Sequence, residues 1–252
     1  MELAKRISAL RRANGLSARQ LAELVGVAPT TVTQVESGAV SPSFHLAQDM
    51  LEVLGEPIGF TGQVDVAAIA AARLAVDPTL MIGLTSDIVT WQQRWARLGL
   101  LDQAGHVLPG KQAALLQRAG RTARLTRRPG AADFQPGLTA FEIAVTLNEH
   151  GVAHAITGDA GANLYQPTAG EAWPVLYVEN TEAAANAVGL TRKSSSFGRR
   201  VTLIPFDGIS EIGRVSINGF TAVAPDQVLI DSYGGIDRMP EQADILMGQR
   251  AS

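Results

Sequence analysis

The stretch SARQLAELVGVAPTTVTQVE, from Ser17 to Glu36, predicts two short helices joined by a tight turn. Ser17 is suited to cap the first helix, because its hydroxyl can accept a backbone N–H of the first turn. Gly26 follows as a stop signal, since glycine adopts the left-handed conformation without steric cost. Pro29 suits the start of the second helix, where a missing N–H is tolerated.

The apolar positions of the two predicted helices are in register for packing against each other. Leu21, Ala22 and Val25 mark one face of the first helix at helical spacing. Val32 and Val35 mark the inner face of the second, and the small Ala22 allows the two backbones to approach closely. Together with the turn, this pattern indicates a helix-turn-helix, and the alternative is an ordinary helical hairpin with a polar exterior.

The outward side of the second helix carries short polar side chains without charge: Thr30, Thr31, Thr33 and Gln34. A helix that enters the major groove of DNA needs such groups. Glutamine can pair with adenine, and threonine offers a hydroxyl and a methyl group for thymine. The pattern therefore favours DNA recognition.

At these residues the chain resembles a known family. Residues Leu3 to about Gly55 look like the Cro/cI phage-repressor family of helix-turn-helix domains, also called the XRE family. The resemblance implies a five-helix, lambda-repressor-like fold whose third helix enters the major groove. It implies an ion pair between Arg11 and Glu36. It also implies a DNA-binding set, with base-facing and phosphate-facing members: Ser17, Ala18, Arg19, Pro29, Thr30, Thr31, Thr33 and Gln34. Pro29 departs from the family, which often has a polar base-reading residue there.

The composition bounds the remaining possibilities. The chain has 252 residues, of which 46% are hydrophobic and 18% charged, enough for two or three domains with real cores. The absence of cysteine excludes disulfides and thiolate metal sites, and it suits a reducing cytoplasm. The amphipathic N-terminus does not read as a secretory signal, and no apolar run is long enough to span a bilayer. We therefore expect a cytoplasmic protein without a membrane partner.

Charge is distributed unevenly along the chain, whose net charge is −3. Residues 92–128 carry eight basic residues and one acidic residue, whereas residues 129–252 carry seven basic and fourteen acidic residues. Nucleic-acid affinity depends on local basic surface. The candidate phosphate contacts in the basic region are Arg94, Arg97, Arg127 and Arg128. The alternative is that this basic region is plain solvated surface.

Three domains are predicted, with boundaries at breaks rich in glycine and proline: residues 1–60, 61–130 and 131–252. The middle one is expected to be helical, with a helix from Asp87 to Leu98 capped by Ser86. Trp91 and Trp95 on that helix are predicted core residues. The following residues 99–109 resemble the end of a winged-helix unit, and the alternative is a helical connector. A basic helix is predicted over residues 111–128.

From Phe141 the pattern changes to alternating helices and strands, which predicts an α+β or α/β sheet domain of about 110 residues. Thr181 is the predicted cap of one of its helices. His150 and His154 lie four residues apart, but Gly151 interrupts the helix between them, so structural roles are favoured over metal binding. We expect no catalytic residue, metal or cofactor in this chain.

One segment of that domain, TGDAGANLYQPTAGEAWPVLYVEN at residues 157–180, weakly resembles the opening of the nucleotidyltransferase fold. Active members carry two carboxylates one residue apart at the start of the next strand, where they hold Mg²⁺. The corresponding residues Trp173 to Val178 contain no carboxylate. The resemblance therefore implies a degraded, non-catalytic domain, and the overall layout is loosely similar to AbiEi-type antitoxins.

The sequence thus predicts a sequence-specific transcriptional regulator that binds double-stranded DNA, acting as a dimeric repressor. Its C-terminal domain would dimerise, sense a small-molecule effector or meet a protein partner. One alternative is an antitoxin or phage-defence regulator whose C-terminal domain holds a toxin. Another is a nucleotidyltransferase with a DNA-targeting head.

Overall fold

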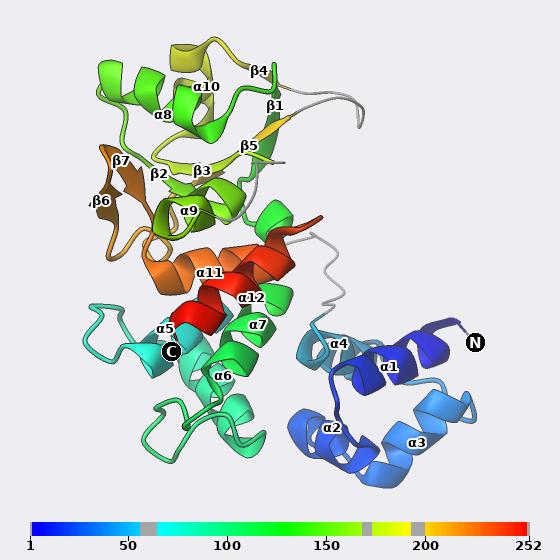
Figure 1. The fold of residues 1–252 in the computed structure, drawn as a ribbon. Coiled ribbons are helices and arrows are strands. Elements are labelled where there is room, and N and C mark those ends of the chain that lie inside the picture. The colour runs from blue at the N-terminus through cyan, green and yellow to red at the C-terminus, as the bar shows by residue number, and fades with distance from the viewer. Residues whose placement is uncertain (1, 56–64, 168–172, 193–199, 251–252) are drawn as a thin grey trace.

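The computed structural model describes residues 2–55, 65–167, 173–192 and 200–250 (Figure 1). The first domain contains four helices in its described part: α1 (Glu2–Ala13), α2 (Ala18–Val25), α3 (Pro29–Ser37) and α4 (Phe44–Val53). They pack around one small core that includes Ile7, Leu21, Val32, Val35 and Met50. The predicted face of each helix is therefore the face that it buries.

Three further helices and a short 3₁₀ turn follow: α5 (Ala67–Val76), α6 (Ser86–Arg97), α7 (Gln112–Thr122) and η1 (Leu125–Arg127). The cap of α6 is Thr85 rather than the predicted Ser86, because the Thr85 hydroxyl accepts the Ile88 N–H at 3.3 Å. Trp91 and Trp95 are buried core residues, as predicted, with ring centroids 5.5 Å apart.

The C-terminal half contains a mixed seven-stranded sheet with the order β4-β1-β5-β3-β2-β7-β6. Its strands are β1 (Ala132–Gln135), β2 (His154–Thr157), β3 (Val175–Val178), β4 (Thr191–Arg192), β5 (Val201–Pro205), β6 (Val215–Ile217) and β7 (Phe220–Ala222). The pairs β3·β5 and β2·β7 are parallel, and the other neighbouring pairs are antiparallel. β1, β4 and β6 were not predicted, because each is short and lacks a continuous apolar run; β4 and β6 are the edge strands, and β1 lies beside β4.

Helices cover both faces of this sheet in layers (Figure 1). One face packs against α8 (Ala140–Glu149) and α10 (Thr181–Val188). The cap of α10 is Asn180 rather than the predicted Thr181. The other face packs against α9 (Gly158–Tyr165) and α11 (Pro225–Tyr233), with α12 (Met239–Arg250) beside them. Because both faces are covered, β2 and β3 are buried along their whole length.

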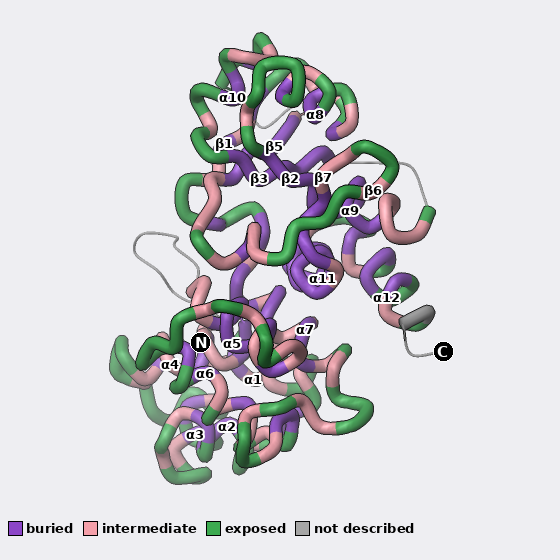
Figure 2. The backbone as a smooth tube through the Cα atoms, turned by 90° about the vertical axis from the view of Figure 1, so that its left-hand side faces the viewer, coloured by how far each residue is buried: buried purple, intermediate pink, exposed green. Residues whose placement is uncertain are grey.

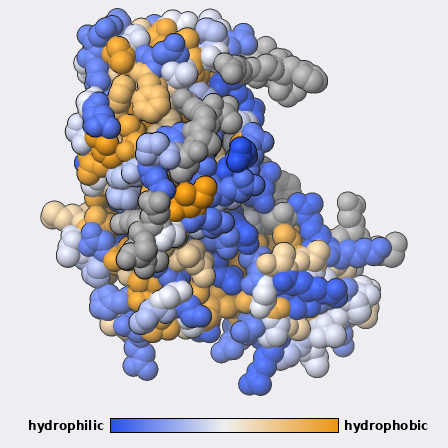
Figure 3. Space-filling view, in the orientation of Figure 1, coloured by the Kyte–Doolittle hydropathy of each residue, from blue (hydrophilic) through white to orange (hydrophobic). Residues whose placement is uncertain are grey.

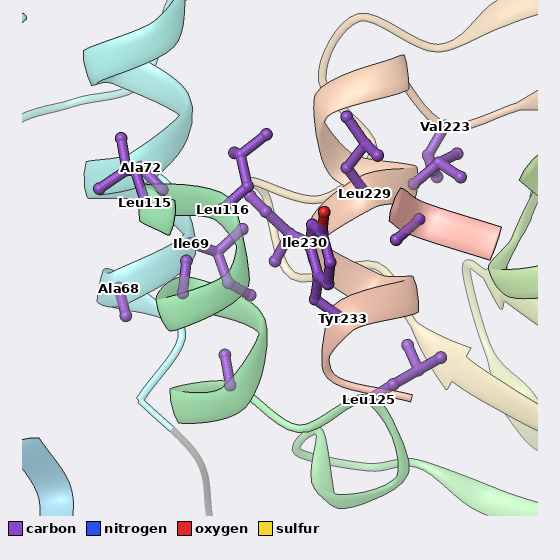
Figure 4. Close-up of a cluster of buried hydrophobic side chains, with 14 of the residues drawn as sticks. Ala68, Ile69, Ala72, Leu115, Leu116, Leu125, Val223, Leu229, Ile230 and Tyr233 are labelled. Carbon is purple, nitrogen blue, oxygen red and sulfur yellow. The ribbon is translucent and has the colours of Figure 1, made fainter. Parts of the chain in front are cut away.

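The helices α5, α6 and α7 belong to the core of the sheet domain. One hydrophobic cluster runs from α5–α7 through α11 and α12 to the sheet. In Figure 4, Leu116 of α7 lies toward Ile230 of α11, while Leu115 lies beside Ala72 of α5. Figure 2 shows α5 and α11 almost wholly buried. The expected boundary near residue 130 therefore falls inside a continuous core and is not a break in packing.

The backbones of α7 and of the end of α11 approach each other closely in this layer. A Cβ added at Gly120 would lie 2.3 Å from the Ile230 carbonyl oxygen, and one added at Gly234 would lie 2.4 Å from the Gly120 oxygen. Real Cβ atoms do not come so close, so glycine is required at both positions for the two backbones to touch. The crossing fixes α7 rigidly on the sheet domain.

The structure differs from the predicted layout in two features. The fifth helix, α5, does not join the core of the first domain but packs into the larger cluster, while residues 56–64 of the expected first domain lie outside the described residues. The winged-helix-like segment forms only an isolated bridge between Leu101 and Val107, and the Val107 N–H donates to the Ala75 carbonyl of α5. Residues 99–109 contain no helix, so they form neither a wing strand nor the helical connector of the alternative interpretation, and they pack on their own domain.

Candidate nucleic-acid interface

The start of α2 is held by a reciprocal capping box. The Ser17 hydroxyl accepts the Gln20 N–H at 3.2 Å, and the Gln20 side-chain oxygen accepts the Ser17 N–H at 2.9 Å. Two of the backbone donors at this helix start are thereby satisfied. At the other end, Gly26 takes a left-handed conformation with φ 72°. These two local signals fix the length and exit direction of α2, as the sequence predicted.

The helix α3 exposes one polar ridge. Val32 and Val35 are fully buried beneath it, while Thr30, Thr33 and Gln34 are exposed. α3 carries no charged residue before Glu36. The surface over the first domain is mostly hydrophilic to neutral (Figure 3). An exposed, uncharged ridge of this kind has the hydrogen-bonding groups that base edges require.

An ion pair ties α1 to the end of α3. Arg11 donates from Nε to Glu36 Oε1 at 2.5 Å and from Nη2 to Oε2 at 2.8 Å, and its Nη1 donates to the Leu16 carbonyl. The hydrogen bond to Glu36 raises the pKa of Arg11, so the guanidinium remains charged. This arrangement confirms the predicted pair, and it fixes the angle at which α3 is presented.

The predicted DNA-binding residues fall into two groups. Two are half-buried, Ala18 and Thr31, and Ala18 packs against the domain's own core. The rest are exposed: Ser17, Arg19, Pro29, Thr30, Thr33 and Gln34. The Thr33 hydroxyl donates to the Pro29 carbonyl at 3.2 Å. The exposed members lie on α3 and at the start of α2, and they form one candidate interface.

The comparisons with known proteins agree with this geometry: residues 7–60 match the family described as helix-turn-helix. The N-terminal domain is a helix-turn-helix domain of the Cro/cI type. The match supports a DNA-binding transcription regulator in general terms. No curated protein and no solved structure matches the chain.

The helix-turn-helix domain is docked on α6 and α7. The Asn14 backbone carbonyl accepts from Arg118 at 3.1 Å, and its side-chain oxygen accepts from Arg121 at 3.5 Å. Leu98 packs against both hydrophobic clusters. Arg118 and Arg121 both belong to α7, so this helix contacts the DNA-binding domain directly.

Glu52 of α4 and Arg94 of α6 form a second contact between the helix-turn-helix domain and the rest of the chain, at 3.7 Å. Burial raises the pKa of Glu52 despite the opposing attraction of Arg94. The Arg94 guanidinium also lies 4.9 Å from the centre of the Trp91 ring. Arg94 is therefore engaged in docking the helix-turn-helix domain, and its role as a phosphate contact stays a prediction.

The remaining candidate phosphate contacts divide sharply. Arg97 and Arg127 are exposed. Arg128 was predicted to be a phosphate contact, and that prediction is wrong, because its side chain is buried in the sheet domain. It donates to Asp231 at 2.6 Å and to the Ala123 carbonyl at 2.8 Å. The cluster of basic residues at 92–128 does not distinguish Arg128 from Arg127, because a buried arginine and an exposed one look alike in sequence.

Asp231 is the centre of a buried polar network. Besides Arg128, it accepts from Thr157 at 2.7 Å, Gln227 at 2.8 Å and Tyr177 at 3.2 Å. Burial raises the pKa of Tyr177 well above its ordinary value, so its phenol stays protonated and donates. The network therefore balances a buried charge with a full set of donors, and it joins Arg128, which follows η1, to β2, β3 and α11.

The structure gives no metal-ligand cluster: among the described residues, no three His, Asp or Glu side chains are grouped to hold an ion. Likewise, no helix within the described ranges is long and apolar enough to cross a membrane. His154 is buried, and its Nδ1 lies 2.9 Å from the Val152 carbonyl. In the segment that resembles a nucleotidyltransferase, β3 consists of Val175–Val178. All four residues are buried, and none is a carboxylate.

Sequence reasoning missed two residues that position the interface. Gln20 completes the capping box, and the spacing Ser-x-x-Gln could have revealed it. Asn14 directly follows α1. Its amide also donates to the Leu54 carbonyl at 3.2 Å, so it links α1, α4 and α7. No local signal marks that role, because its partners are far away in the chain.

Proposed function

We propose that this protein is a sequence-specific, DNA-binding transcriptional regulator that acts as a dimeric repressor. The observation that supports it most is the exposed ridge of Thr30, Thr33 and Gln34, which rests on buried Val32 and Val35. Gln34 and the threonines read base edges in the major groove. Arg19, at the start of α2, contacts phosphate, where the backbone N–H groups and helix dipole also favour an anion.

A dimer is proposed because one such module binds weakly. Two-fold pairing places two recognition helices on half-sites separated by about one helical turn, or a multiple of it. Arg97 and Arg127 add phosphate contacts that carry no sequence information. The sheet domain dimerises, responds to an effector or binds a protein partner.

We also propose that the sheet domain does not transfer nucleotides. The support is the sequence of β3, which is wholly apolar apart from the Tyr177 phenol and carries no carboxylate where active nucleotidyltransferases hold their metal. Metal-dependent labelling of a target by a radiolabelled nucleotide would overturn this part of the proposal.

The test is selection of bound sequences from a random DNA pool, with the mass of the complex measured alongside. We expect a two-fold symmetric site and two chains per duplex. A variant with Thr30→Ala, Thr33→Ala and Gln34→Ala together should lose the enrichment, while Gln103→Ala, an exposed glutamine in the α6–α7 connector, should keep it. No enriched sequence with the unaltered chain would refute the proposal, and a co-purifying second protein would favour the antitoxin alternative.

A further inference from the structure

A groove on the sheet domain lies between the start of α7 and the end of α12. Its volume is about 420 Å³, within the range of about 300–1,000 Å³ that small-molecule sites occupy. Ala113 borders it on α7, Met247 and Asp244 border it on α12, and Tyr233 of α11 also lines it. These residues come from three helices, so the groove exists only in the folded chain.

The polar groups of this groove are arranged around one carboxylate. Tyr233 is buried, and its hydroxyl donates to Asp244 Oδ1 at 2.8 Å. Burial and the neighbouring Asp244 raise the pKa of Tyr233, so the phenol remains a donor. Asp244 Oδ2 has no partner among the described residues, and no lysine or arginine described here lines the groove. Asp244 itself is exposed, so the open oxygen is a negatively charged hydrogen-bond acceptor at the solvent-facing side of the groove.

Gly110 and the polar Gln112 line the groove at the start of α7, and the rest of the lining is suited to an apolar group. The Met247 side chain is adaptable, the Ala113 methyl is small, and the Tyr233 ring is flat and mostly enclosed. Gly248 also borders the groove, and a Cβ added there would meet nothing within 4 Å. The space beside α12 is therefore open.

We propose that this groove binds a small molecule with a protonated amine on an apolar body, and that the bound ligand acts as an effector of the helix-turn-helix domain. The ammonium group donates to Asp244 Oδ2, a charge-assisted hydrogen bond. The apolar body packs against Met247, Ala113 and the Tyr233 ring. A free amine and an amino acid can both present an ammonium group on an apolar body, and the binding test distinguishes between them.

The route from the groove to the DNA-binding domain is α7. Tyr233 directly precedes Gly234, whose backbone touches Gly120 in the last turn of α7. On either side of Gly120, Arg118 and Arg121 donate to Asn14 of the helix-turn-helix domain. A ligand that holds the start of α7 against α12 therefore acts on the same rigid helix that docks the DNA-binding domain. This coupling step rests on the proposed function, whereas ligand binding does not.

The binding test is calorimetric titration of the full chain with three probes of one shape: 2-phenylethylamine, phenylalanine and 3-phenylpropionate. We expect the amine to bind and the acid, which lacks the ammonium group, to bind at least about tenfold more weakly. Phenylalanine binding as well as the amine identifies an amino acid as the source, and weaker binding identifies a free amine. Equal binding of the acid and the amine would overturn the proposal, as would no binding of either ammonium-bearing probe.

Two variants test the site itself. Asp244→Asn keeps an acceptor for Tyr233 but removes the charge, and should weaken amine binding about tenfold or more. Gly248→Phe adds a ring beside α12, where an added Cβ meets nothing within 4 Å, and should abolish binding at unchanged thermal stability. Glu241→Gln, an exposed acidic residue on the same helix that pairs with Arg238, is the matched control and should bind normally. Unchanged binding in Asp244→Asn and Gly248→Phe would place the ligand elsewhere.

The coupling is measured by the affinity for a selected DNA site with and without saturating amine. We expect a change of about fivefold or more in the unaltered chain and none in Gly248→Phe. An unchanged DNA affinity at full occupancy would overturn the effector role. A chain that binds no DNA even without the amine would instead refute the proposed function, so the two failures are distinguishable.

Discussion

Arg128 Nη2 lies 2.6 Å from Asp231 Oδ1 in the interior of the sheet domain, and both side chains are almost inaccessible to water. Arg127, the preceding residue, is exposed. The two adjacent arginines therefore have opposite roles, and their substitutions should give opposite results.

Arg128→Ala is expected to destabilise the protein by about 3–5 kcal/mol, because it leaves Asp231 as an uncompensated buried charge. Urea unfolding should show this loss as a lower midpoint. Arg127→Ala should leave the midpoint within about 0.5 kcal/mol of the original, as for an exposed residue away from any packed feature. Equal effects of the two variants on stability would contradict the assigned burial.

Salt dependence of DNA binding provides the second prediction. Replacing Arg97 and Arg127 together by alanine should weaken binding to all sequences and reduce the salt slope by about one per lost phosphate contact. The measurement is DNA affinity at several salt concentrations. Lys111→Ala, an exposed basic residue at the start of α7, is the control that should leave the slope unchanged. If the double variant keeps the original salt slope, Arg97 and Arg127 do not contact phosphate.

Gln34→Ala should cost about 1–3 kcal/mol of binding free energy on the preferred site and little on random DNA, because a base contact carries the discrimination. Competition binding with both DNAs measures the two costs. Gln103→Ala serves again as the exposed glutamine control. Equal losses on specific and random DNA would assign Gln34 to backbone binding instead of base reading.

The docking contact between Glu52 and Arg94 should be sensitive to pH. Burial raises the pKa of Glu52 above its ordinary value of 4.5, so the folded protein retains the proton over a range where the unfolded chain has lost it. Stability from this group is therefore present at low pH and lost as pH rises through the folded-state pKa. Glu52→Gln, which mimics the protonated form, should remove this dependence.

The check is to unfold the original chain and Glu52→Gln between pH 4 and pH 8. The variant should gain stability relative to the original as pH rises, and the difference should level off above the folded-state pKa. If the variant instead lost stability relative to the original chain as pH rises, the attraction of Arg94 for Glu52 would outweigh the cost of burying the Glu52 charge.

The extent of the candidate interface was predictable because its signals are local. Ser17 and Gly26 set the ends of α2 through bonds and conformations within a few residues, and Val32 and Val35 decide which face of α3 is buried. The ion pair between Arg11 and Glu36 was available from the family resemblance, since its partners lie 25 residues apart. The groove between α7 and α12 was not predictable in this way, because its lining residues are far apart in the sequence.

The sequence by itself determined the helix-turn-helix, its polar ridge and the alternation of helices and strands after Phe141, because capping, glycine conformation and apolar periodicity act over short distances. Only the tertiary structure decided that α5–α7 join the sheet domain, that Arg128 is buried while Arg127 is not, and that α7 contacts both Asn14 and Gly234. These outcomes depend on which distant surfaces meet, and the free energy of burying a side chain is set by partners that no local pattern names.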